Sequence, residues 1–187
     1  MIEPNLDILL ELKSISNSNE GSFFNNPDEN GKKEQKLFVK KIIDMIKPKN
    51  VLEIGTDKGY FVYFLMLNCD THVTTCDLWE FSSLAIDVLK KYFEKRINFF
   101  NEDSHTLLPK LNNVFDMVWV DGNHEYSACM GDLINCQKLN IANILVDDYR
   151  ELDSVKKAVN DFCSTTSYRV SNQSCLIDSR GIVYLTK

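Results

Sequence analysis

The sequence predicts an α/β fold: a doubly wound, mostly parallel sheet of seven strands with helices on both faces. Three observations support this prediction. From residue 51 onward, short apolar runs alternate with stretches of helical periodicity, which is typical of βαβ units. The first run ends in a turn with glycines at positions 55 and 59, as expected where a buried strand passes into a helix. The last run follows no helix, so we expect that strand to pair antiparallel with its neighbour.

The chain begins with a segment, residues 1–33, that lies outside this alternation. Apolar residues at helical spacing predict a short helix over 6–15, and the Asn- and Ser-rich stretch after it predicts a long flexible loop of the kind that often forms a lid. Residues 34–47 again show helical spacing, and Pro48 ends that helix. We therefore expect an N-terminal helix and lid at 1–33 and one folded domain at 34–187.

The alternating part of the chain predicts its elements in order. Short apolar runs bounded by polar residues are expected to form strands at 51–55, 72–77, 96–100, 115–120 and 143–147. The stretches between them repeat apolar residues every three or four positions and are expected to form helices at 59–68, 82–95, 104–111, 125–138 and 152–163. Two further strands are expected near 167–171 and 181–186.

Composition and charge narrow the class of protein. A chain of 187 residues, 44% of them hydrophobic and 26% charged, suits one soluble domain. The net charge of −6, without a long basic run, argues against a nucleic-acid partner. No apolar stretch approaches the roughly 18 residues of a membrane span, and the N-terminus lacks a signal-peptide pattern, so we expect no membrane partner and a cytoplasmic location. The six cysteines form no CxxC pair and are expected to be reduced structural thiols.

Acidic residues lie toward the carboxyl ends of the first two predicted strands. Glu53 precedes Gly55 and Gly59, whose missing side chains would let the backbone approach a ligand. A carboxylate at this point favours a cationic or hydroxyl-bearing ligand over a pyrophosphate, although glycine turns also occur for purely structural reasons. Asp77 lies 22 residues after Gly55, the spacing at which an acid commonly binds the ribose hydroxyls of a nucleotide-type cofactor. The alternative for Asp77 is a solvated loop acid.

Three more acids end the fourth and fifth predicted strands, at Asp121, Asp147 and Asp148. The carboxyl ends of parallel strands share one edge of a sheet, so these side chains are expected to form an all-oxygen cluster that suits a hard divalent cation such as Mg²⁺. The alternative is that they cap helices or face solvent. For Asp103 and Ser104, which follow the third strand, a role as a helix cap is equally consistent with the pattern.

His124 lies three residues after Asp121, on the turn that leads from the fourth strand into a helix. A histidine beside a metal site can take the proton of a bound hydroxyl near neutral pH, so we interpret His124 as a candidate general base. His72 and His105 are expected to be structural or exposed.

These motifs together resemble the class I S-adenosylmethionine-dependent methyltransferases, which have a Rossmann-like sheet. The pattern Glu-Ile-Gly-x-x-x-Gly-Tyr at 53–60 is similar to metal-dependent O-methyltransferases of the catechol and caffeoyl-CoA type. Asp-Gly-Asn-His-Glu-Tyr at 121–126, followed by Asp132 and by Asp-Asp-Tyr at 147–149, resembles the methyltransferase-24 family more narrowly. That family includes macrolide-sugar O-methyltransferases, and the resemblance covers about residues 34–187.

The resemblance implies a site and a reaction. Cofactor contacts would come from Glu53, Gly55, Thr56, Gly59, Tyr60, Asp77, Leu78, Trp79, Asp103, Ser104 and Asp121. Mg²⁺ would be held by Asp121, Asp147 and Asp148, and the catalytic residues would be His124, as base, and Asp121. The acceptor would be a hydroxyl of a small molecule or sugar. Because the N-terminal segment is short, the resemblance implies either a small substrate site or a site that a partner subunit of a homo-oligomer completes.

The chain departs from the family pattern at three points. Phe61 stands where the catechol type often has a cofactor-contacting serine, residues 138–143 lack the usual Pro-Gly-Gly turn, and Asp147 replaces a glutamate of the macrolide-sugar members. Two alternatives therefore stay open: a metal-independent methyltransferase, and a non-catalytic module that binds the cofactor. An NAD-linked enzyme is disfavoured, because Asp57 occupies the middle glycine position of Gly-x-Gly-x-x-Gly.

Overall fold

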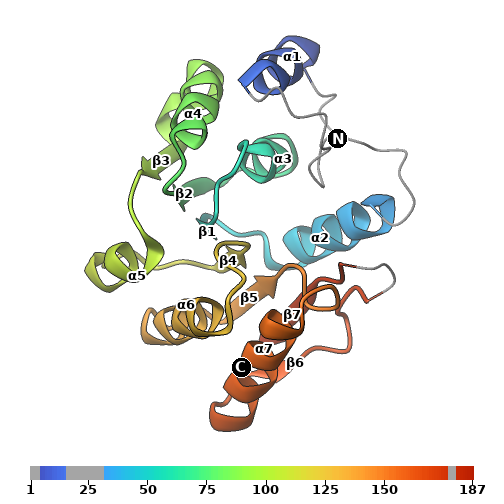
Figure 1. Cartoon of the computed structure of the whole chain (residues 1–187). Coiled ribbons are helices and arrows are strands. Elements are labelled where there is room, and N and C mark those ends of the chain that lie inside the picture. Colours follow the sequence, from blue (N-terminus) through green and yellow to red (C-terminus); the bar gives the residue numbers. More distant parts are fainter. Residues whose placement is uncertain (1–4, 16–31, 177–179) are drawn as a thin grey trace.

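The structure is a computed structural model that describes residues 5–15, 32–176 and 180–187 (Figure 1). Its centre is a seven-stranded sheet with the order β3-β2-β1-β4-β5-β7-β6. The strands are β1 (Asn50–Ile54), β2 (His72–Cys76), β3 (Ile97–Phe100), β4 (Met117–Val120), β5 (Asn143–Val146), β6 (Arg169–Val170) and β7 (Val183–Thr186). The first five strands pair in parallel, and β7 pairs antiparallel with β5 and β6, which confirms the predicted fold class.

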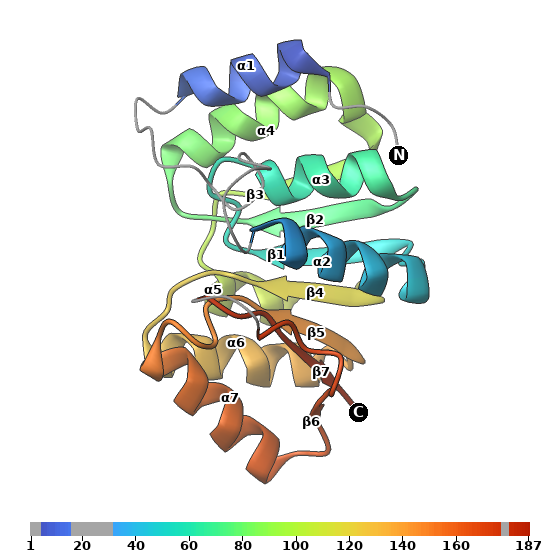
Figure 2. The same cartoon turned by 90° about the vertical axis from the view of Figure 1, so that its right-hand side faces the viewer.

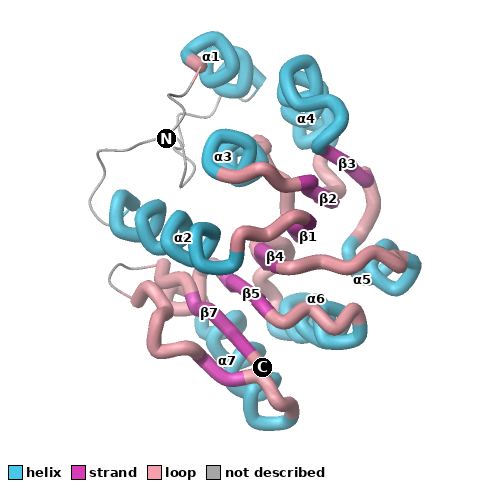
Figure 3. The backbone as a smooth tube through the Cα atoms, turned by 180° about the vertical axis from the view of Figure 1, so that it is seen from behind, coloured by secondary structure: helices cyan, strands magenta, loops and turns pink. Residues whose placement is uncertain are grey.

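Helices cover both faces of this sheet, as Figures 1 and 3 show from opposite sides. One face carries α2 (Lys32–Ile46), α3 (Tyr60–Asn68) and α4 (Glu80–Phe93), and α1 (Leu6–Ile15) lies on the outside of α4. The other face carries α5 (Ser104–Leu107), α6 (Tyr126–Lys138) and α7 (Asp153–Thr165). The predicted loop at 16–33 lies, up to residue 31, outside the described residues.

Alternation along the strands creates a hydrophobic core on each side of the sheet. Val51 and Trp119 face α2 and α3, where the Trp119 ring stacks on Phe61 with ring centres 4.5 Å apart. Leu52 and Val118 face α6 and α7 on the opposite side. Because side chains of a strand alternate between faces, a central strand that is covered on both sides is mostly apolar. The continuous apolar runs of the sequence therefore reflect burial on both faces.

Several boundaries differ from the predicted ones. The helix expected at 104–111 is a single turn, α5, followed by a 3-10 turn over Leu108–Lys110. Pro109 explains the break, because proline has no N–H to donate and its ring clashes with a preceding helical turn. The strand expected near 167–171 contains only two ladder residues, Arg169 and Val170, and both are exposed at the edge of the sheet.

Four of the six cysteines are buried, and Cys69 and Cys163 are half-buried, which agrees with a role as small apolar side chains. Within the described residues, no helix combines the length and the apolar character that crossing a membrane requires.

Candidate active site

The carboxyl ends of four strands meet at one edge of the sheet (Figure 2). In the ladder, Ile54 pairs with Cys76 and with Val120, and Val120 pairs with Val146. The residues that follow these positions are Gly55, Asp77, Asp121 and Asp147. The parallel register therefore brings the predicted cofactor turn and the predicted acid cluster to the same edge, as the sequence indicated.

Both glycines of the turn after β1 have positive φ values, and both are packed against protein atoms. Gly55 has φ +91°, and a Cβ atom there would lie 2.0 Å from the carbonyl oxygen of Asp121. Gly59 has φ +71° and precedes α3, and a Cβ atom there would lie 3.1 Å from Leu89 Cδ1. Glycine is thus required at position 55 to let the ends of β1 and β4 approach each other, independently of any ligand.

Glu53 is a buried carboxyl group on β1 with a hydroxyl chain beside it. The Thr75 hydroxyl donates to Glu53 Oε2, and the Thr56 and Thr75 hydroxyls are hydrogen-bonded at 2.6 Å. If Thr75 donates its proton to Glu53, Thr56 must donate to Thr75. Burial raises the pKa of Glu53 well above its ordinary value, and the negative charges of Asp121 and Asp77 raise it further. A cationic ligand group at this point would restore the ionised form.

Asp77 joins two of the turns at the sheet edge. Its Oδ2 atom accepts from the backbone N–H of Asp57 at 2.8 Å, and its Oδ1 atom accepts from that of Trp79 at 3.0 Å. Leu78 and Trp79 are each 65% exposed, and the Trp79 ring stacks on Phe81 with centres 5.9 Å apart. A carboxylate beside a flat exposed apolar surface is an arrangement that can recognise a ribose and its base.

The remaining predicted cofactor residues have structural partners. Asp103 is the N-cap of α5 and accepts from the His105 N–H at 3.0 Å, so the capping alternative is confirmed for this residue. The Ser104 hydroxyl donates to Asp132 Oδ1 at 2.6 Å. Tyr60 is the first residue of α3 and is buried. Contact of these side chains with a cofactor stays a prediction.

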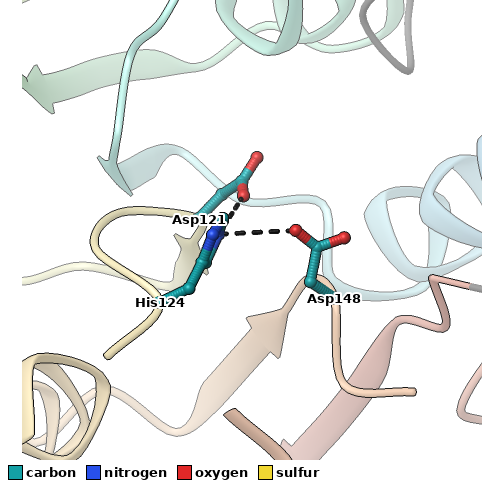
Figure 4. A group of neighbouring side chains, drawn as sticks. All are labelled: Asp121, His124 and Asp148. Carbon is teal, nitrogen blue, oxygen red and sulfur yellow. Dashed lines mark hydrogen bonds and ion pairs between the residues drawn. The ribbon is translucent and has the colours of Figure 1, made fainter. Parts of the chain in front are cut away.

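Asp121, His124 and Asp148 form a compact group, drawn in Figure 4. One ligand atom of each lies within 4.8 Å of the others. His124 Nε2 is 3.3 Å from Asp121 Oδ1 and 3.4 Å from Asp148 Oδ2. The hydrogen bond that His124 donates to the Asp121 carboxylate raises the pKa of His124, although burial of the ring opposes this effect. The sequence predicted His124 beside this cluster, and the structure brings it into contact with two of the three acids.

Asp147 lies next to this group and is almost fully buried. Its Oδ1 atom accepts from the Asp148 N–H at 2.9 Å, whereas Asp147 Oδ2 and Asp148 Oδ1 are buried and have no hydrogen-bond partner among the described residues. Burial raises the pKa of Asp147 well above its ordinary value, and Asp121 and Asp148 raise it further. Ionised carboxylate oxygens that are buried without hydrogen-bond partners are costly, and a cation bound at this cluster would offset that cost.

Arg180 is a site residue that the sequence analysis missed. Its Nε atom lies 3.8 Å from Asp148 Oδ1 and 3.6 Å from Glu151 Oε2. The backbone holds it there, because the Arg180 carbonyl accepts from the N–H of Arg150 at 2.7 Å. No local pattern points to Arg180, which reaches the site only because β7 returns antiparallel beside β5.

The donor set of the cluster fits a divalent cation. Carboxylate oxygens with water suit Mg²⁺ and Mn²⁺, and an imidazole nitrogen adds a donor that Mn²⁺ and other transition metals accept. The observation that carries this fit is that two buried oxygens, Asp147 Oδ2 and Asp148 Oδ1, have no hydrogen-bond partner among the described residues.

Comparison with known proteins identifies the family. The family described as methyltransferase domain matches residues 52–149, which is more than half of the chain. The chain belongs to this methyltransferase family. The match confirms the resemblance to the methyltransferase-24 family, and it spans the glycine turn, the acid cluster and His124. No curated protein matches the sequence of this methyltransferase.

Solved structures share the fold of this methyltransferase. The methyltransferase PaMTH1 of Podospora anserina, with S-adenosylhomocysteine bound, is 15% identical with a TM-score of 0.73, over 99% of this chain and 89% of that one. An O-methyltransferase of Bacillus cereus, in complex with the same molecule, is 18% identical with a TM-score of 0.68, over 98% and 92%. The N-methyltransferase NodS of Bradyrhizobium japonicum is 13% identical with a TM-score of 0.66, over 96% and 98%. Since both O- and N-methyltransferases share this fold, the fold does not name the acceptor atom.

Proposed function

We propose that this methyltransferase transfers the methyl group of S-adenosylmethionine to a hydroxyl group of a small molecule or sugar, with Mg²⁺ at the acid cluster and His124 as general base. The observation that carries the proposal is the group formed by Asp121, His124 and Asp148, which lies at the same sheet edge as the glycine turn and Asp77. An acceptor bound over this edge would contact both halves of the site.

The cofactor half of the site would be formed by the turns after β1 and β2. S-adenosylmethionine supplies a methyl group on a positively charged sulfur. Glu53, with its raised pKa, and Asp57 would favour the positively charged end of that molecule. The Asp77 carboxylate accepts one backbone N–H at each oxygen and retains lone pairs for two ribose hydroxyls. The exposed ring of Trp79 would lie beside the adenine.

The acceptor half would be formed by the turns after β4 and β5. Mg²⁺ would be held by Asp121, Asp147 and Asp148, and when bound it lowers the pKa of an acceptor hydroxyl and orients it. His124 Nε2 takes the hydroxyl proton, the oxygen forms a bond with the methyl carbon, and the carbon–sulfur bond breaks to leave S-adenosylhomocysteine. Positioning of two reactants in one site supplies much of the rate.

Carboxylates are better ligands for Mg²⁺ than imidazole is, which leaves His124 available for proton transfer. In the free protein, the pKa of His124 is raised by its hydrogen bond to Asp121. Cation binding at the same acids would lower that pKa again and keep the ring neutral, which a base requires.

The cofactor is tested first. Calorimetric titration with S-adenosylmethionine and S-adenosylhomocysteine is expected to show micromolar binding to the wild type and loss of binding in Asp77→Ala, while both proteins remain folded by circular dichroism. Well-folded wild type that binds neither ligand would refute the proposal at its first step.

The reaction is tested next, by transfer of a labelled methyl group to a panel of phenols, catechols and sugars. We expect turnover that stops with a chelator and returns with Mg²⁺. His124→Gln should abolish turnover and retain S-adenosylhomocysteine binding. Full activity of His124→Gln would remove this residue from the mechanism. Cofactor binding by the wild type without transfer to any acceptor would favour the non-catalytic alternative.

One observation favours the metal-independent alternative as a second candidate. Asp148 already has two cationic neighbours, His124 at 3.4 Å and Arg180 at 3.8 Å, which partly balance its charge. In that case the acids would serve to orient His124 and to hold the turn after β5. Turnover that survives exhaustive chelation would decide in its favour.

A further inference from the structure

Helices α5 and α6 lie side by side (Figure 1). They meet at a partly buried polar contact that takes no part in the reaction proposed above. Asp132, on α6, is only 1% exposed. Its Oδ1 atom accepts from the Ser104 hydroxyl at 2.6 Å and lies 3.4 Å from His105 Nε2. The same imidazole nitrogen is 3.0 Å from the carbonyl oxygen of Ala128, one turn earlier on α6. One carboxylate thus joins α6 to the first two residues of α5.

The glycine at position 131 of α6 provides the space that this contact requires. Glycine is disfavoured inside a helix because it lacks a side chain and has a flexible backbone. A Cβ atom at Gly131 would lie 2.6 Å from Cε1 and 2.7 Å from Nε2 of the His105 ring. Gly131 therefore leaves space for the His105 ring. The adjacent Asp132 supplies the carboxylate that contacts both Ser104 and His105.

The other oxygen of Asp132 faces the turn after β4. A Cβ atom at Gly122 would lie 3.6 Å from Asp132 Oδ2 and 3.0 Å from Ile54 Cγ2. Gly122 follows Asp121 directly, so the Asp132 carboxylate lies between the turn after β3 and the turn that begins the acid cluster.

We propose that Asp132 is a positioning residue that fixes the turn after β3 against the turn after β4, so that both turns present a constant surface to the adenosyl part of the cofactor. This inference rests on the proposed function, in which the cofactor lies over these strand ends. A helix as short as α5, with four residues, has no stability of its own and takes its position from tertiary contacts. The partly buried, charge-assisted hydrogen bond between Ser104 and Asp132 is directional enough to fix the position of α5.

The proposal predicts that cofactor binding depends on the ionisation state of Asp132, and therefore on pH. Burial raises the pKa of Asp132 to about 6, and its hydrogen bond with Ser104 opposes this rise. The other ionisable groups that face it are His105 and the N-cap Asp103 from α5, and three thiols, Cys76 from β2 and Cys129 and Cys136 from α6. Burial raises the pKa of each thiol, so the thiols stay neutral around pH 6.

The test compares three proteins in titrations with S-adenosylhomocysteine between pH 5.5 and pH 8. Asp132→Asn keeps the shape of the side chain and removes the charge, and Asp87→Asn makes the same change at an exposed position of α4. We expect Asp132→Asn to bind about tenfold more weakly at pH 8, as expected for loss of a charged hydrogen bond. The affinity of the wild type should fall relative to the variant as the pH drops through about 6, and Asp87→Asn should follow the wild type.

A second variant distinguishes the loss of this contact from unfolding of the protein. Gly131→Ala leaves Asp132 in place and displaces His105, so it should also weaken binding while urea unfolding remains cooperative. Equal affinity and equal pH dependence of the wild type and Asp132→Asn would overturn the inference and leave the proposed function intact. Absence of binding by the folded wild type would instead refute the proposed function, and this inference with it.

Discussion

Substitution of Gly55 by alanine tests the close approach of β1 and β4 at the centre of the site. The new Cβ atom would lie 2.0 Å from the Asp121 carbonyl oxygen and 2.6 Å from its carbon, and these are backbone atoms that cannot rotate away. Relief requires one turn to move, which strains the Asp121 N–H bond to Ile54 at 2.9 Å. A positive φ costs alanine about 1–2 kcal/mol, and overpacking adds about 1–3 kcal/mol. We expect Gly55→Ala to lower the free energy of unfolding by about 2–5 kcal/mol, the sum of these two contributions.

Gly59→Ala is the matched control, because Gly59 also has a positive φ, +71°. Its nearest neighbour would be Leu89 Cδ1 at 3.1 Å, the end of a side chain that can move by a few tenths of an ångström. Only the backbone cost remains, about 1–2 kcal/mol. Urea unfolding followed by the fluorescence of buried Trp119 measures both variants. If Gly55→Ala destabilises the protein no more than Gly59→Ala does, the described contact between the two strand ends is wrong.

Three further predictions concern charge and buried hydrogen bonds. Arg180→Met removes a cation beside Asp148, so calorimetry should show Mn²⁺ binding that is roughly three- to tenfold tighter than in the wild type; weaker binding would contradict the assigned role. Tyr168→Phe removes a buried hydroxyl that donates to the Ile141 carbonyl at 2.5 Å, and urea unfolding should show a loss of about 1–2 kcal/mol. His124 has a raised pKa in the fold, so its pairing stabilises the protein at low pH and this contribution disappears as the pH rises through that pKa. In the absence of metal, His124→Gln should therefore have a lower free energy of unfolding than the wild type at pH 6. At pH 9 the two free energies of unfolding should be the same.

The fold could be predicted because burial on both faces of the sheet leaves a strong local signal. Continuous apolar runs at β1, β4 and β5 alternate with helical spacing, and each run ends in an acid or a glycine turn. The parallel ladder then dictates that Asp77, Asp121 and Asp147 share an edge, so their proximity followed from the fold class alone. The break of the predicted helix at Pro109 was present in the sequence, but the apolar spacing on both sides of the proline obscured it.

The contacts that could not be predicted join residues far apart in sequence through the packing of whole elements. Ser104 and Asp132 are on different helices, and Arg180 meets Asp148 only through the antiparallel return of β7. Neither contact produces a periodicity or a characteristic residue spacing in the sequence. Gly131 was the one visible sign, since a glycine inside a predicted helix indicates a close neighbour, but the sequence does not say that the neighbour is His105.

The charge balance of the acid cluster leads to a last prediction. Three carboxylates, of Asp121, Asp147 and Asp148, face one guanidinium, Arg180, and the imidazole of His124. With all acids ionised and His124 neutral, the group lacks two positive charges. Burial raises the pKa values of Asp147 and Asp148, and neighbouring negative charges raise them further. The hydrogen bond to Asp121 raises the pKa of His124. In the free protein, bound protons therefore supply part of this deficit.

A divalent cation supplies the same two charges, so its binding must compete with these protons. Titration with Mn²⁺ at pH 6.5 in buffers of different ionisation enthalpy should therefore show proton release, and His124→Gln should release less. The sign matters for catalysis, because a base is useful only after it has lost its own proton. Cation binding without proton release would mean that His124 is already neutral in the free protein, and its role as a base would then depend on the acceptor alone.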